Sequence, residues 1–127
     1  MVSEYEECTD ALVDPTVLIE LQAELGGDPT IISTFVGNYV ELLPWRVDRL
    51  HHALEKLDIE DAMDAVLSLK TSSHMVGAIC MSRLATELEI SIRLLPNAAH
   101  LDELRPLVNE IEHFVPATIR ELKTPLL

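Results

Sequence analysis

The stretch that decides the fold covers residues 58–97 and reads DIEDAMDAVLSLKTSSHMVGAICMSRLATELEISIRLLPN. It holds two runs in which apolar residues recur at intervals of three and four, the spacing of a buried stripe on an α-helix. The first run begins after Asp58, a residue type that caps helices, and the second ends at Pro96-Asn97. Gly77 lies between the runs and either interrupts a helix or marks a turn. The stretch therefore predicts two long amphipathic helices.

The chain before this stretch predicts two more helices. Asp14-Pro15 and Asp28-Pro29 each place a capping carboxylate before a proline, which suits the first turn of a helix. Gly26-Gly27 is expected to end the first of these helices. Pro44 lies inside the apolar stripe of the second, so we expect it to kink that helix or to split it.

The chain after this stretch predicts one last helix, with an apolar stripe from Leu101 to Leu122. Pro106 and Pro116 lie inside the stripe, so a bend or a late start is expected there. Together the elements predict an all-α protein, an antiparallel four-helix bundle with an additional short N-terminal helix. The bundle domain is assigned to residues 13–127, after an acidic and partly ordered segment at residues 1–12.

Composition and charge narrow the function. The chain has 127 residues and a net charge of −13, which suits one acidic domain and disfavours binding to nucleic acid or to anionic membrane. No apolar run suggests a leader or a membrane span. Cys8 and Cys80 lie far apart and are interpreted as reduced thiols, so a cytoplasmic protein is expected. No pattern indicates a cofactor or an enzyme's catalytic group, and no metal site is expected.

Charge is unevenly spread along the chain. No Asp or Glu occurs from Ala65 to Thr86, a window that contains Lys70, His74 and Arg83. One interpretation is that this window forms the most buried hairpin of the bundle. The other is a docking face for an acidic partner, kept free of like charge. The charge pattern alone leaves both open.

The same window carries a family resemblance. Residues 65–78 read AVLSLKTSSHMVGA and are followed by Leu84 and by Leu88-Glu89. This run resembles the signature of histidine phosphotransfer (HPt) domains, roughly A-H-x-L-K-G-S-S-x-x-x-G-A and then L-x-x-x-L-E. The residues that match in register are Leu69, Lys70, Ser72, Ser73, Gly77 and Ala78. The helix starts also fall where the family places them, so the resemblance covers about residues 13–123. It implies a cytosolic four-helix bundle that exchanges a phosphoryl group with receiver domains in a phosphorelay.

Two residues depart from the signature, and both lie on its functional face. Leu67 stands where the family has its phospho-accepting histidine, and leucine has no nucleophile. Thr71 stands where the family has a glycine, and a β-branched side chain narrows the approach of a partner. The resemblance is therefore to a degenerate HPt domain, which has no acceptor at the usual position.

These departures favour a binding module over a relay protein. The expected partner is the receiver domain of a response regulator or a sensor kinase. It would dock on Leu67, Lys70, Thr71 and His74, and within the motif Lys70 is expected to pair with acidic groups of the receiver. The alternative is a working relay in which His74, two helical turns from Leu67, is the acceptor. Such a shift would require the partner to dock in a different position.

A more remote alternative is a di-metal site inside the bundle. Such sites use Glu-x-x-His pairs on two helices and a further Glu from each of the other two. Glu110-x-x-His113 supplies one such spacing, and Asp48-x-x-His51 supplies a weaker second. Both residues of the first pair flank the apolar stripe, which disfavours an inward-facing site.

Overall fold

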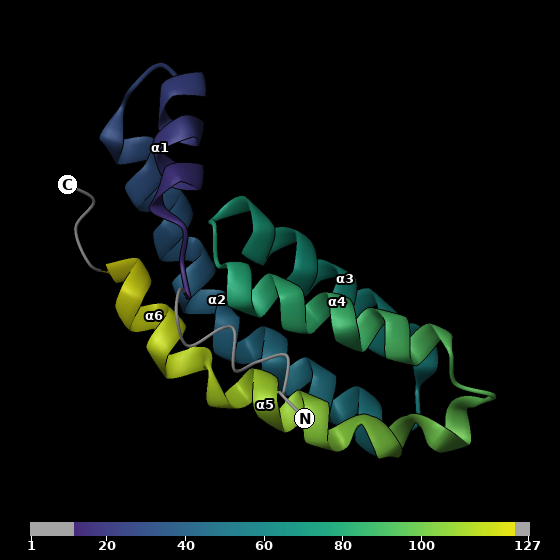
Figure 1. Ribbon diagram of the computed structural model, residues 1–127. Coiled ribbons are helices and arrows are strands. Elements are labelled where there is room, and N and C mark those ends of the chain that lie inside the picture. Colours follow the sequence, from purple (N-terminus) through teal and green to yellow (C-terminus); the bar gives the residue numbers. More distant parts are fainter. Residues whose placement is uncertain (1–11, 124–127) are drawn as a thin grey trace, which may run out of the picture.

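The computed structural model describes residues 12–123, and every regular element in that range is helical (Figure 1). In chain order the elements are α1 (Pro15–Glu24), α2 (Pro29–Glu55), α3 (Ile59–Met75), α4 (Ile79–Arg93), the 3-10 helix η2 (Ala98–Leu104), α5 (Arg105–His113) and α6 (Val115–Lys123). Helices α2, α3, α4 and α5 pack side by side and alternate in direction. The predicted antiparallel four-helix bundle with an extra short N-terminal helix is confirmed.

The Asp-Pro pairs start helices as expected. The carboxylate of Asp14 accepts a hydrogen bond of 3.0 Å from the backbone N–H of Thr16, and Asp28 does the same for Thr30 at 2.9 Å. These bonds satisfy N–H groups that the first helical turn leaves without partners. Helix α1 packs against the N-terminal part of α2, which extends beyond the four-helix bundle (Figure 1).

Three prolines lie within the apolar stripes that the sequence predicted. Pro44 lies inside α2, which is a single helix of 27 residues, so of the expected kink or split the split does not occur. Pro106 and Pro116 each lie in the first turn of a helix, where a missing N–H costs nothing. The predicted last helix is therefore three successive elements, η2, α5 and α6, and the late starts coincide with the prolines.

The core lies between the inner stripes of α2, α3, α4 and α5. Its largest fully buried side chains are Leu18, Leu43, Val47, Leu50, Leu54, Leu69, Met81, Leu84, Leu88, Ile92, Leu101 and Ile111. Cys80 is also buried, and it is disulfide-bonded rather than the reduced thiol that the sequence suggested. Separation along a chain does not decide whether a cysteine finds a partner, since the fold sets that distance.

Two sequence-based expectations concern the chain ends and the membrane. Apart from Leu12, the acidic segment predicted at residues 1–12 lies outside the described residues, as does Cys8. None of the helices within residues 12–123 combines the length and the apolar character that crossing a bilayer requires.

Gly77 forms the turn between α3 and α4, and the chain entering α1 lies directly against it. Its φ angle of +77° falls in the left-handed region that favours glycine. Its carbonyl accepts a 2.8 Å hydrogen bond from the backbone N–H of Asp14. A Cβ atom at residue 77 would lie 2.6 Å from the backbone oxygen of Asp14, which is closer than van der Waals contact allows. Glycine is therefore required here both for its backbone angle and for the close approach.

Gly77→Ala should destabilise the fold by roughly 2 kcal/mol, because alanine resists the positive φ and its methyl group meets the backbone of Asp14. Gly37→Ala is the matched control, since Gly37 lies within α2 and has no atom near its added Cβ. That control should raise stability by up to about 1 kcal/mol. Urea unfolding followed by circular dichroism measures both. Equal effects of the two substitutions would contradict the account of the turn.

Candidate functional site on helices α3 and α4

The residues that the sequence singled out lie on one side of α3. Leu67, Lys70, Thr71 and His74 follow at intervals of three and four within α3, so they share a helix face. Leu67 and Lys70 are half-buried, whereas Thr71 and His74 are exposed. We call these four residues the α3 face. The structure therefore brings together all the predicted partner-binding residues.

Lys70 contacts α4 through an ion pair. Its Nζ atom lies 2.7 Å from Oε1 of Glu89, and the other oxygen of Glu89 accepts bonds of 3.1 and 2.9 Å from the guanidinium of Arg93. The Glu89 side chain is 12% exposed, against 34% for Lys70 and 59% for Arg93. The largely buried carboxylate of Glu89 thus binds two cations that are partly exposed to solvent. We call these three residues the Glu89 network.

Hydrogen bonds from Lys70 and Arg93, together with their charges, hold the pKa of the Glu89 carboxyl below its usual value of 4.5. Glu89 is therefore ionised at neutral pH, and both cations keep their partner. The sequence placed Lys70 and Glu89 in the same motif but gave no sign that they touch, because they are 19 residues apart on different helices. Only the antiparallel packing of α3 and α4 brings them together.

The histidine of the α3 face borders a shallow hollow of about 350 Å³ next to α4. The hollow is lined by His74, Ile79, Ser82, Arg83, Thr86, Glu87 and Ile90. His74 lies in the last turn of α3, where the helix dipole favours a positive charge. It is the one histidine among the four residues of the α3 face, and an imidazole nitrogen can act as a nucleophile.

Several residues of the motif serve the scaffold. The hydroxyl groups of Ser73 and Tyr39 share a buried hydrogen bond of 2.7 Å, which joins α3 to α2. Burial raises the pKa of Tyr39 to about 12, so its hydroxyl stays neutral. The hydroxyl of Ser72 donates to the backbone oxygen of Ser68 at 2.7 Å, within α3. The hydroxyl groups of both serines are used in hydrogen bonds inside the bundle or within α3. We therefore assign these serines to the scaffold and not to the α3 face.

Leu67 lies at the edge of the inner stripe, as its helical phase predicted. Its side chain is half-buried and packs against the core cluster. Thr71, one turn further along, is exposed and places a branched side chain on the surface. Leu67 therefore offers an apolar contact and no group that can attack phosphorus.

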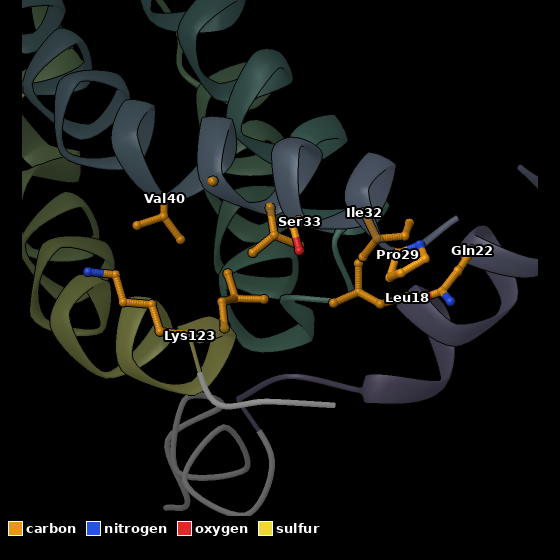
Figure 2. A pocket seen from close by; sticks show the side chains of 10 residues that line it. Leu18, Gln22, Pro29, Ile32, Ser33, Val40 and Lys123 are labelled. Carbon is orange, nitrogen blue, oxygen red and sulfur yellow. The ribbon is translucent and has the colours of Figure 1, made fainter. Parts of the chain in front are cut away.

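A second depression lies away from this face, between α1, α2 and α6 (Figure 2). It measures about 440 Å³ and is lined by Leu18, Gln22, Pro29, Ile32, Ser33, Val36, Gly37, Val40, Leu122 and Lys123. The lining is mostly apolar and includes no carboxylate, histidine or cysteine. It therefore provides no acid–base pair and no metal ligands.

The structure contradicts the remote di-metal alternative. Among the described residues, no three His, Cys, Asp or Glu side chains approach closely enough to hold a metal ion. His51 instead lies 3.3 Å from Glu112, the neighbour of the expected ligand His113. His113 is exposed and stacks edge-on against Phe114, with ring centroids 5.3 Å apart. The helical phase of α5 thus turns this histidine away from the bundle interior.

No protein-family model matches the sequence, and no curated protein matches it either. Among solved structures, the chain resembles the HPt domain of a sensor hybrid histidine kinase from Shewanella, with a TM-score of 0.66. The match covers 87% of this chain and 93% of the other at 16% sequence identity. The chain has the HPt fold.

This likeness confirms the resemblance read from the sequence at the level of the fold. An HPt fold supplies an antiparallel pair of helices with a solvent-facing surface, and here α3 and α4 form that pair. The pairing of Lys70 with Glu89 and the hydrogen bond of Ser73 show how HPt signature residues act within this chain.

The Glu89 network should make a pH-dependent contribution to stability. The carboxyl pKa is lower in the folded state than in the unfolded chain, so its contribution is present above the ordinary value of 4.5 and is lost as pH falls through the folded value. The difference in unfolding free energy between the wild type and Glu89→Gln should therefore be greatest near neutral pH and shrink in acid. Urea unfolding at a series of pH values measures it. A difference that stays constant down to strongly acidic pH would contradict the assignment.

Proposed function

We propose that this protein is an HPt-like signalling module that docks a receiver domain of a response regulator, or a sensor kinase, and does not accept phosphate at the usual HPt position. The proposal is supported by the HPt fold together with Leu67 at the residue that the sequence resemblance aligns with the family's acceptor histidine. The module would act as an adaptor or an inhibitor. It would sequester a receiver or compete for it with a true phosphotransfer protein, and it would not turn over a substrate.

The chemistry of the α3 face supports binding without transfer. Phosphoryl transfer from a receiver aspartate requires a nucleophile aligned with the phosphorus atom. Leu67 supplies none, and the side chain of Thr71 occupies surface that a glycine would leave open. The face carries no carboxylate of its own, so it does not repel the acidic active site of a receiver.

The proposed setting is the cytoplasm, where receiver domains and the catalytic parts of sensor kinases meet. The absence of a membrane-crossing helix within residues 12–123 is compatible with that setting. The disulfide at Cys80 is not what the sequence argument for the cytoplasm assumed, so the proposal rests on the HPt fold and not on the cysteines.

Binding without phosphoryl transfer is the first prediction of this proposal. In titration calorimetry against a panel of receiver domains, at least one receiver should bind, and labelled receivers should transfer no phosphoryl group to the wild type. Thr71→Glu should weaken binding by about tenfold, because it places a carboxylate opposite an acidic receiver site. Thr34→Glu is the matched control, since Thr34 is exposed on the distant N-terminal part of α2. Equal losses for both variants would place the docking surface elsewhere.

Restoring the two missing residues should create an acceptor. Leu67→His combined with Thr71→Gly supplies an imidazole and opens the surface beside it, so we expect the double variant to accept label from a receiver that binds the wild type. Autoradiography after incubation with phosphorylated receivers measures transfer. A folded double variant that still binds the receiver and takes no label would show that the docking position is not that of an HPt domain.

His74 supports a second candidate function, a relay with a displaced acceptor. The supporting observation is that this imidazole is exposed at the rim of a hollow that Arg83 also lines, and a guanidinium can stabilise a phosphoryl group. Under this alternative the wild type takes label and His74→Ala does not. His113→Ala, which removes an exposed histidine on α5, serves as the control.

A further inference from the structure

The charges around the α3 face are not free to meet a partner. Lys70 is the cation of that face, and its ammonium is already 2.7 Å from Glu89. Arg93, one turn beyond Glu89 on α4, is bound to the second oxygen of the same carboxylate. Both oxygens of Glu89 are thus engaged by cations that would otherwise project into solvent beside the docking surface.

We infer that Glu89 limits the affinity of this face for acidic receivers by holding Lys70 and Arg93 in an intramolecular ion-pair network. The inference rests on the proposed function and adds a residue that regulates it. An acidic group of a partner must compete with Glu89 for the two cations or share them with it. The electrostatic gain from docking is therefore smaller than the number of cations on the surface suggests.

The position of Glu89 makes that competition effective. Its side chain is 12% exposed, so water replaces a lost partner poorly, and leaving this carboxylate without its cations is costly. Lys70 and Arg93 are more exposed and bind different oxygens of the carboxylate, Lys70 from α3 and Arg93 from α4. Breaking the network also removes a link between these two helices. The partner would have to offset both losses.

The remaining attraction is apolar. Leu67 is half-buried at the surface of α3, Ile90 is 52% exposed on α4, and Leu94, directly after the end of α4, is 77% exposed. Ile90 also lines the hollow beside His74, so it lies on the side of α4 that borders α3. Apolar contacts respond little to ionic strength, whereas contacts between charges weaken as salt is added. The wild type should therefore bind its receiver with a weak dependence on salt.

Removing the charge of Glu89 should release both cations. In titrations against the same receiver panel, we expect Glu89→Gln to bind about three- to tenfold more tightly than the wild type at ~50 mM salt and to lose most of that advantage at ~500 mM. Glu121→Gln is the matched control, because it removes one exposed carboxylate from α6 and leaves the network intact. A gain of the same size in the control would overturn the inference, since it would reflect net charge alone.

Lys70→Gln, alone and combined with Glu89→Gln, provides a second test. If Glu89 holds Lys70, its removal should weaken binding at least about threefold more in the Glu89→Gln background than in the wild type, because only there is the ammonium released. Equal losses in the two backgrounds would show that Glu89 does not restrain this lysine, which would overturn the inference.

The outcomes separate this inference from the proposed function. Wild-type binding that Glu89→Gln leaves unchanged, with thermal unfolding showing an intact fold, overturns the inference and leaves the proposed function standing. A receiver that binds Glu89→Gln and not the wild type supports the inference in its strongest form. If no receiver binds the wild type, Glu89→Gln or the control, both the docking role and the regulation by Glu89 are wrong.

Discussion

The turn at Gly77 is the constraint on which the packing of α3 against α4 depends. Only a residue without a Cβ can hold its positive φ and lie so close to the backbone of Asp14. This turn reverses the chain between α3 and α4, and the same contact joins the start of α1 to the bundle. Because α4 then returns along α3, Glu89 lies opposite Lys70 and His74 borders the hollow beside α4. A different turn would leave these residues on unrelated surfaces.

The division between retained and altered signature residues follows their structural roles. Ser73 bonds to Tyr39 in the interior, Gly77 forms the turn, and Lys70 links α3 to α4. Leu67 and Thr71 lie where the bundle requires neither a histidine nor a glycine. The chain therefore has the HPt architecture without a histidine at position 67, and under the proposed function folding and phosphoryl chemistry depend on different residues.

Burial accounts for only part of the stretch without carboxylates. Its inner side is buried core, where an unpaired charge would be costly, and this explains the absence of acids at positions such as Val66 and Leu69. Its outer side includes the exposed residues Thr71 and His74, which burial does not explain. On that side the lack of carboxylates leaves an exposed surface without acidic side chains, in a chain whose net charge is −13. The proposed docking of an acidic partner would require such a surface.

The sequence alone determined the helices and the face on which the signature lies, because capping residues, prolines and apolar spacing act locally. It predicted α1, α3 and α4 closely, it left open a split at Pro44 that does not occur, and it erred at Cys80. It indicated that His113 lies outside the inner stripe, and Glu89 and Arg93 are one helical turn apart, but it could not place Glu89 against Lys70, which is 19 residues away on another helix. That arrangement depends on how whole helices pack and rotate against one another, and contacts between residues distant in the chain are decided only by the tertiary structure.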